Sequence, residues 1–230
     1  MDIAEPDAHG TRRPGKPLQL RARLASIGIL ALGGLQVLFG MFLASIPTQD
    51  EVAEMSDSEY DALQARMEWL GNEALLTLVE LGLKMTAGVL FWMWMYRAYQ
   101  NLTALERAPE HDAARAVWCW FVPLANLVLP YQMMAEIWRK SGAHIDDLEA
   151  DSTEWNSGPP TLVALWWGTW LLERVTGTIA GRSESTLTFY AIDVMLVCVS
   201  GALAIAMVHE VTRRQEAALQ RGRVGAPMTF

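Results

Sequence analysis

The sequence predicts an all-α integral membrane protein, a four-helix bundle with a proline-broken re-entrant or interfacial helix on the cytoplasmic side. Three observations lead to this fold class: long apolar runs, an uneven distribution of basic residues, and two prolines in one further apolar stretch. Hydrophobic residues make up 52% and charged residues 19% of the 230 residues. A chain with this composition must concentrate its apolar residues in blocks, which is typical of membrane proteins.

Four apolar runs are long enough to cross a bilayer. They cover about residues 22–46, 74–97, 161–180 and 187–208, and each is near the ~20 residues that span ~30 Å of hydrocarbon. The first run is too long for the apolar core of a cleavable signal peptide, which has about 7 to 15 residues. We therefore expect a membrane domain over residues 22–210, between a flexible basic cytoplasmic tail (1–21) and a second cytoplasmic tail (211–230).

A further apolar run, about residues 116–138, decides the topology. If this run crosses the membrane, the loops and tails of a five-crossing chain place nine basic residues inside and seven outside. If it stays on the cytoplasmic side, both termini are cytoplasmic, and fourteen basic residues lie inside against two outside, Arg66 and Arg182. The positive-inside rule selects this second topology.

Two prolines in the same run agree with the charge distribution. Pro123 and Pro130 each remove a backbone donor and disfavour helix in the preceding residue, so we expect helix breaks near residues 121–122 and 129. A lipid-exposed spanning helix could not leave the freed backbone groups unpaired. Asn126, midway between the prolines, is expected to hydrogen-bond those groups. Whether the segment dips into the bilayer or lies along the interface stays open.

The acidic loop between the first two crossings carries a helix signal. Ser56 and Glu59 form a capping-box pattern, in which a serine begins the helix and a glutamate three residues later reaches back to it. The apolar residues that follow recur on one helical face; they are Tyr60, Leu63, Met67 and Leu70. We expect an amphipathic helix on the outer surface over about residues 56–70.

Five ionisable residues lie within the predicted crossings: Glu80, Lys84, Glu173, Arg174 and Asp193. Charged groups at membrane depth normally face the bundle interior and pair with one another. The four-crossing topology places opposite charges from three crossings at a similar depth in the outer half of the membrane. This cluster could be a salt-bridge network that fixes helix register, or a polar path or proton relay, and Arg174 could instead snorkel to the interface.

The remaining composition argues against several classes of site. The four histidines (His9, His111, His144 and His209) are scattered and offer no paired axial ligands, so we expect no cofactor, and no metal site is indicated. No basic stripe of the kind that binds nucleic acid is present.

Small residues, such as Gly177 and Gly181, favour close helix packing within the chain, with homo-oligomers as a secondary possibility.

Two stretches resemble the signature of a bacterial membrane family known as domain of unknown function 4328. The first is WMYRAYQN, from Trp94 through Arg97 and Tyr99 to Asn101; the second is WFVPLAN, Trp120 to Asn126, followed by Pro130, Tyr131 and Trp138. The resemblance covers about residues 75–208. It implies four crossings with the motif region between the second and third, and it implies no activity. The positions that it singles out are Arg97, Asn101, Trp120, Pro123, Asn126, Pro130 and Tyr131.

These observations predict a multi-pass protein of the bacterial cytoplasmic membrane that is not an enzyme. The distinctive residues are structural types at an interface, and no nucleophile beside a base stands out. The leading hypothesis is an accessory or scaffold subunit whose cytoplasmic aromatic and proline-containing segment binds a protein partner or lipid. The alternative is a small transporter or an ion or proton channel that uses the intramembrane charges.

Overall fold

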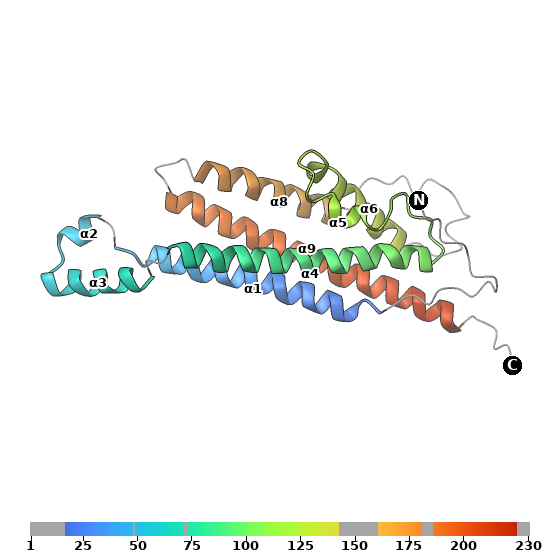
Figure 1. Cartoon of the computed structure of the whole chain (residues 1–230), viewed down its shortest axis with the longest axis horizontal. Helices are drawn as coiled ribbons and strands as arrows, with labels where there is room; N and C mark the ends of the chain where they lie inside the picture. The colour runs from blue at the N-terminus through green and yellow to red at the C-terminus, as the bar shows by residue number, and fades with distance from the viewer. Residues whose placement is uncertain (1–16, 48, 71–72, 143–160, 181–185, 225–230) are drawn as a thin grey trace. The chain divides into compact units, whose positions relative to one another are not determined.

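A computed structural model describes residues 17–47, 49–70, 73–142, 161–180 and 186–224 of the chain (Figure 1). All regular secondary structure within these ranges is helical, which confirms the predicted all-α class. The elements are α1 (Gln19–Ala44), α2 (Gln49–Ala53), α3 (Asp57–Leu70), α4 (Glu73–Ala104), α5 (Arg115–Trp118), the 3₁₀ helix η1 (Ala125–Leu127), α6 (Leu129–Gly142), α8 (Thr161–Ala180) and α9 (Thr186–Val224).

Three of these helices are long and apolar enough to cross a membrane. Among the described residues, the candidate spans are Gln19–Phe42 in α1, Leu78–Ala104 in α4 and Thr188–Arg221 in α9. The fourth predicted crossing coincides with α8, which is not among these candidates. Adjacent Glu173 and Arg174 near the middle of α8 lower its apolar character.

The chain forms two compact units, which share the long helices. Unit 1 comprises Met1–Arg23, Trp92–Val163 and Ala206–Phe230, and unit 2 comprises Leu24–Phe91 and Ala164–Ile205. Unit 1 therefore contains the end of α4, the α5–η1–α6 segment and the second half of α9. Unit 2 contains most of α1, the first parts of α4 and α9, most of α8, and the short helices α2 and α3.

In unit 2, close approaches link neighbouring helices. A Cβ atom added at Gly28 of α1 would lie 3.2 Å from the Ala87 Cα of α4, and one at Gly201 of α9 would lie 3.0 Å from Ile29 Cγ2 of α1. Both glycines therefore bring the helices closer than a larger residue permits. Further contacts join α8 to α9, where Asp193 lies against Gly177, and α4 to α8, where the Phe91 and Trp166 ring centroids are 5.8 Å apart.

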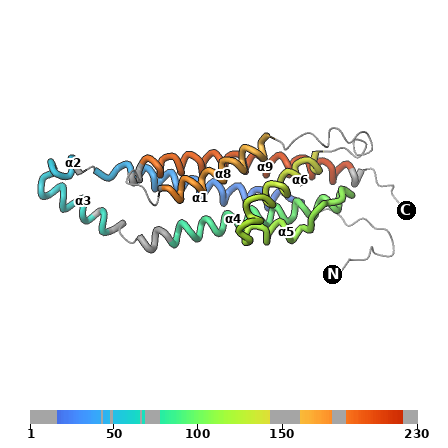
Figure 2. The backbone as a smooth tube through the Cα atoms, turned by 90° about the horizontal axis from the view of Figure 1, so that it is seen from above, coloured from blue at the N-terminus to red at the C-terminus, as the bar shows by residue number. Residues whose placement is uncertain are grey.

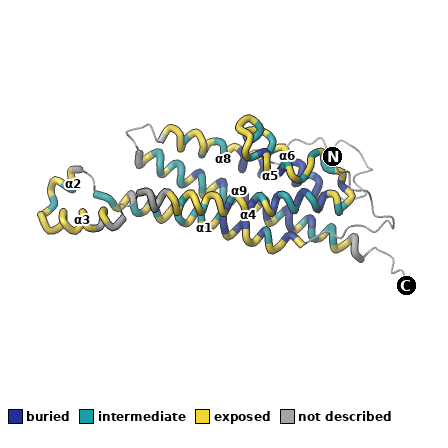
Figure 3. The backbone as a smooth tube through the Cα atoms, viewed as in Figure 1, coloured by how far each residue is buried: buried dark blue, intermediate teal, exposed yellow. Residues whose placement is uncertain are grey.

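Unit 1 has its own core, to which α4, α6 and α9 contribute the largest side chains. Residues coloured as buried lie at the end of α4, on α6 and in the second half of α9 (Figure 3). They include Trp94, Met95 and Leu102 on α4, Met133, Met134 and Ile137 on α6, and Met207, Val208 and Val211 on α9. The tail expected from residue 211 onward is thus a continuation of α9, whose residues beyond 210 contribute to this core.

The run from Arg115 to Gly142 is interrupted between two helices. α5 ends at Trp118, the single 3₁₀ turn η1 follows, and α6 begins at Leu129 (Figure 2). Pro130 therefore occupies the first turn of α6, where its missing N–H would have no intrahelical partner in any case. No single helix of spanning length covers residues 116–138.

α3 begins at the predicted cap. The Glu59 carboxylate accepts hydrogen bonds from the Ser56 backbone N–H (2.9 Å) and hydroxyl (2.6 Å). These two bonds lower the pKa of Glu59. Most of α3 is exposed, including Tyr60 and Met67 on its expected apolar face (Figure 3).

Candidate functional site

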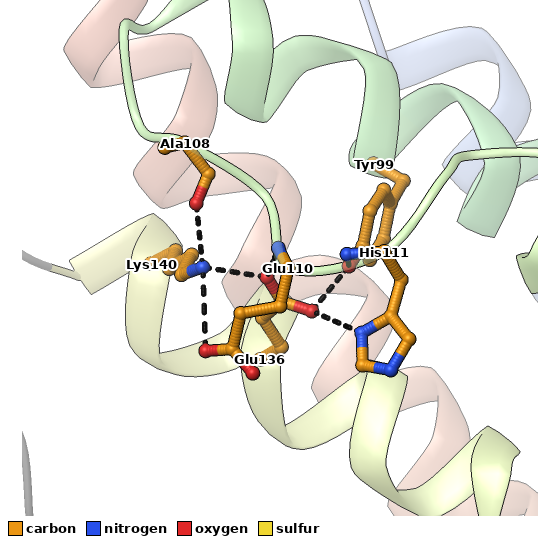
Figure 4. A network of polar contacts seen from close by, with 6 residues as sticks. All are labelled: Tyr99, Ala108, Glu110, His111, Glu136 and Lys140. Atoms are coloured by element: carbon orange, nitrogen blue, oxygen red, sulfur yellow. Dashed lines mark hydrogen bonds and ion pairs between the residues drawn. The ribbon is translucent and has the colours of Figure 1, made fainter.

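Among the described residues of unit 1, the carboxylate of Glu136 has four polar partners although it is only 2% exposed (Figure 4). It lies on the face of α6 that carries Met133, Met134 and Ile137 into the core. A buried carboxylate is costly unless donors surround it. The structure supplies four such donors, so Glu136 is the centre of what we call the Glu136 network.

Each oxygen of Glu136 has two partners. Oε1 accepts from Lys140 Nζ at 2.6 Å and from the Glu110 backbone N–H at 2.6 Å. Oε2 accepts from the Tyr99 hydroxyl and lies 3.1 Å from His111 Nδ1. Figure 4 shows these groups converging from α4, from the loop after α4 and from α6. The carboxylate therefore holds three separate chain segments together.

Lys140 supplies the positive charge of the network. It stands one helical turn after Glu136, so both side chains project from the same face of α6. Its ammonium also donates to the Ala108 carbonyl (2.7 Å) and lies 3.5 Å from the exposed Glu110 carboxylate. Both members of the ion pair are buried. They hold the loop in place through hydrogen bonds to its backbone, at the Glu110 N–H and the Ala108 carbonyl.

The loop that carries Ala108, Glu110 and His111 starts from an unusual helix end. Arg107 N–H donates to the Leu102 carbonyl (2.9 Å) and Glu106 N–H to the Thr103 carbonyl (3.0 Å), the pair of bonds that defines a Schellman motif. Glu106 has a φ of 60°, the left-handed conformation that this motif requires at a position usually taken by glycine. This turn reverses the chain and brings the loop back over α6.

The electrostatics keep Glu136 ionised. Burial raises the pKa of its carboxyl, but the hydrogen bonds from Lys140, Tyr99, the Glu110 N–H and His111 act in the opposite direction. The bonds prevail, and the pKa of Glu136 lies below its ordinary value. The network therefore contains an ionised carboxylate within hydrogen-bonding distance of Lys140 Nζ.

The same groups could be considered as metal ligands. One ligand atom each from Glu110, His111 and Glu136 lie within 4.8 Å of one another. However, Lys140 Nζ already approaches both carboxylates, at 2.6 Å and 3.5 Å. A divalent cation would share this space with the ammonium at the cost of like-charge repulsion. The arrangement therefore fits an internal ion pair better than a metal centre.

In unit 2, the structure brings together two of the predicted intramembrane charges. Lys84 Nζ lies 2.7 Å from Glu80 Oε1 on the next turn of α4. Gln36 of α1, which sequence analysis did not single out, donates to the same oxygen at 2.8 Å and accepts from the Tyr190 hydroxyl of α9 at 3.1 Å. A polar chain therefore links three helices.

The other three predicted charges have different surroundings. Asp193 lies 3.5 Å from the Thr176 hydroxyl of α8. Arg174 is exposed, with its guanidinium 4.7 Å from the ring centroid of Trp170, whereas Glu173 is half-buried. Glu173 and Arg174 point in different directions, as adjacent residues on a helix must.

A model of the family described as "Domain of unknown function (DUF4328)" matches residues 63–215, more than half of the chain. The chain belongs to the DUF4328 family. No curated protein and no solved structure matches it. The DUF4328 region begins within α3 and ends at Gln215, so it includes the whole Glu136 network.

The first DUF4328 stretch lies mainly in the core of unit 1. Trp94 is fully buried and donates to the Thr212 hydroxyl of α9 (3.1 Å). Tyr99 is a member of the Glu136 network, and Asn101 is buried. Arg97 is half-exposed and donates to Gln100 (2.6 Å). This stretch thus serves the packing of α4 rather than an open site.

The second DUF4328 stretch is more exposed. The Trp120 indole donates to the Ala116 carbonyl (3.1 Å), Pro123 is exposed, and Pro130 is buried. Tyr131 and Trp138 are half-buried; Trp138 packs under the Arg214 guanidinium, 4.4 Å from its ring centroid.

Asn126 does not act as we expected. Its side-chain oxygen is buried and accepts no hydrogen bond from the described residues. The N–H groups of Asn126, Leu127 and Val128 donate to carbonyls three or four residues earlier, so local turn hydrogen bonds shape this part of the chain.

Sequence reasoning missed the centre of the site. Glu136, Lys140, Glu110 and Gln215 were not proposed as site residues, and His111 was set aside as isolated. One signal was available: Glu136 and Lys140 stand at i,i+4, and the residues on either side of Glu136 are apolar, which indicates a buried pair. Gln215 extends the polar contacts, because its amide donates to the Ala98 carbonyl (2.9 Å) and the Ser141 hydroxyl (3.0 Å).

Proposed function

We propose that this DUF4328 protein is a non-enzymatic accessory or scaffold subunit of the bacterial cytoplasmic membrane. Its α1, α4, α8 and α9 helices cross the bilayer as a four-helix bundle with both termini in the cytoplasm. The distribution of basic residues supports this topology. The contacts of α1 with α4 and α9, and of α8 with α4 and α9, support the bundle.

In this proposal, the segment from Ala116 to Trp138 is the binding surface for a protein partner or lipid. One observation carries the idea: this segment exposes large apolar side chains on a loop, while the helix behind it is tightly anchored. Leu124 is 82% exposed and Phe121 63% exposed. Exposed apolar groups gathered in one place mark interaction sites.

The Glu136 network explains how such a loop keeps its shape. α6 begins at the loop and is tied through Glu136 and Lys140 to α4 and to the segment from Ala108 to His111. An apolar loop held by a rigid helix loses little conformational entropy on binding. The buried ion pair therefore supports binding by holding the loop in position, and it takes no part in a reaction.

Site-specific photo-crosslinking in native membranes tests this function. A photo-reactive amino acid at Leu124 should give a reproducible adduct with lipid or with one protein. The same residue at exposed Asp112, in the loop before α5, serves as the control and should give none above background. Equal, diffuse labelling from both positions would count against a binding role for the segment.

A second function, as a small transporter or channel, is favoured by the polar chain of Gln36, Glu80, Lys84 and Tyr190. Such a chain inside a membrane is a candidate path for protons or ions. The substitutions Glu80→Gln and Asp193→Asn should abolish flux in proteoliposomes if this is correct. If both variants, and the wild type, show the leak of empty liposomes, transport is excluded.

A further inference from the structure

Six exposed apolar side chains lie between the last residue of α5 and the start of α6, and we call this set the apolar loop. It consists of Trp118, Phe121, Val122, Leu124, Leu127 and Val128, all exposed. Many other exposed large apolar residues lie on α1, α4 and α9, the candidate spans. The apolar loop differs because it combines this exposure with a backbone that is not a long helix.

The apolar loop adjoins the surface of a candidate span. Trp92 of α4 packs against two rings of the segment, with centroids 5.1 Å from Phe121 and 6.2 Å from Trp120. The next residue on α4, Met93, is 45% exposed within the span Leu78–Ala104. The loop therefore contacts α4 at the same level as a residue, Met93, that faces acyl chains if α4 crosses the membrane.

The lack of charged residues in the loop favours lipid over a polar partner. Residues 116–135 contain no Asp, Glu, Lys, Arg or His. The nearest charge before the loop is Arg115, whose guanidinium lies 5.8 Å from the Trp118 ring centroid. A tryptophan beside an arginine, next to an uncharged apolar surface, matches the boundary between anionic headgroups and acyl chains.

Part of the loop's backbone is also suited to shallow insertion. The N–H groups of Trp120, Phe121, Asn126, Leu127 and Val128 already donate to nearby carbonyls. Pro123 has no N–H to satisfy. Backbone groups that are bonded within the turn can leave water at a lower cost than free ones.

We propose that the apolar loop inserts into the cytoplasmic leaflet, with the acyl chains of anionic phospholipid as its occupant and Arg115 at the phosphate level. Phe121 and Leu124 enter the leaflet furthest. This inference rests on the proposed function, because it assigns lipid, rather than a protein partner, to the same segment. The loop would anchor α6 at the membrane surface.

Spin labels at single cysteines test the inference in vesicles of phosphatidylglycerol and phosphatidylethanolamine. The background is Cys198→Ala; Cys119 stays, because it is fully buried and burial raises the pKa of its thiol to about 11. Labels replace Phe121 or Leu124, with Met93→Cys as the lipid-facing control and Asp112→Cys as the aqueous control. Circular dichroism in detergent verifies that each variant folds.

Labels at 121 and 124 should collide more often with oxygen than with a water-soluble nickel chelate, as at 93 and unlike at 112. Arg115→Gln should reduce this preference in vesicles with phosphatidylglycerol and leave it unchanged in phosphatidylcholine, and Arg115→Lys should restore it. Nickel accessibility at 121 and 124 equal to that at 112 would overturn lipid insertion.

Two further results separate this inference from the proposed function. Labels that are immobile and shielded in native membranes, but water-accessible in the vesicles, would indicate a protein partner; they would overturn lipid insertion and leave the binding role intact. If a membrane-impermeant maleimide modified position 124 from the periplasmic side, both the inference and the proposed topology would be overturned.

Discussion

Lys140 Nζ lies 2.6 Å from Glu136 Oε1, one turn apart on α6, with both side chains almost completely buried. A pair of this kind stabilises a structure less than its short distance suggests, because both charges have left water. Removing only one partner is nevertheless strongly destabilising, because the other charge stays buried without a counter-ion. We therefore expect the removal of one partner to destabilise the protein more than the replacement of both.

The substitution Glu136→Gln should lower the free energy of unfolding by about 3–5 kcal/mol, because it leaves the Lys140 ammonium buried without its carboxylate. The double variant Glu136→Gln with Lys140→Met should be more stable than the single variant. Thermal and denaturant unfolding in detergent, followed by tryptophan fluorescence, measures both. A single variant as stable as the wild type would show that the pair does not anchor α6.

Acid should remove the contribution of Glu136. The pKa of Glu136 in the folded protein is lower than in the unfolded chain, where a glutamate titrates near about 4.3. Its ionised form therefore stabilises the fold at every pH above the unfolded value, and this contribution disappears as the pH falls through the folded value. The difference in melting temperature between wild type and Glu136→Gln should stay constant near neutral pH and narrow below about pH 4. A difference that stays the same down to low pH would mean that the charge of Glu136 is not the source of the stability.

The left-handed conformation at Glu106 predicts that glycine at this position makes the protein more stable than alanine does. A left-handed conformation costs a non-glycine residue about 1–2 kcal/mol, so Glu106→Gly should be more stable than Glu106→Ala by about 1 kcal/mol. Alanine is the proper reference, because both changes remove the glutamate side chain. Glycine and alanine variants with equal melting temperatures would contradict the assignment of the Schellman motif.

The contact between α1 and α9 predicts that alanine substitutions at two glycines have different effects on stability. Gly201→Ala should be destabilising by about 1–3 kcal/mol, because the new methyl group would meet Ile29 Cγ2 at 3.0 Å. Gly34→Ala is the matched control on α1, since its Cβ would meet nothing within 4 Å; it should be neutral or stabilising by up to about 1 kcal/mol. Ile29→Ala should relieve the cost of Gly201→Ala in the double variant. If both alanine variants behave alike, the helices do not approach as closely as described.

Local features of the chain were readable in advance. Apolar runs of about twenty residues predicted long helices, and α1, α4 and α9 are long and apolar enough to span a membrane. The capping box at Ser56 and Glu59 forms as expected, because a cap depends on residues three positions apart. The paired motifs led to the DUF4328 family, whose match is confirmed over residues 63–215.

Long-range features could not be read in the same way. His111 looked isolated along the chain, and it contacts Glu136 only because the turn at Glu106 reverses the backbone. Asn126 was expected to bond backbone groups, yet its side-chain oxygen has no partner among the described residues. The fourth crossing, through α8, and the position of the apolar loop at the membrane remain predictions.

The sequence by itself determined that this is a helical protein of the DUF4328 family with segments able to cross a bilayer. The reason is that each such segment is a single helix, whose apolar residues follow one another in the chain. Only the tertiary structure decided that Tyr99, Glu110, His111, Glu136 and Lys140 form one buried network. A buried charge is stable only where donors from several segments converge on it, and that convergence depends on how the helices fold back on one another.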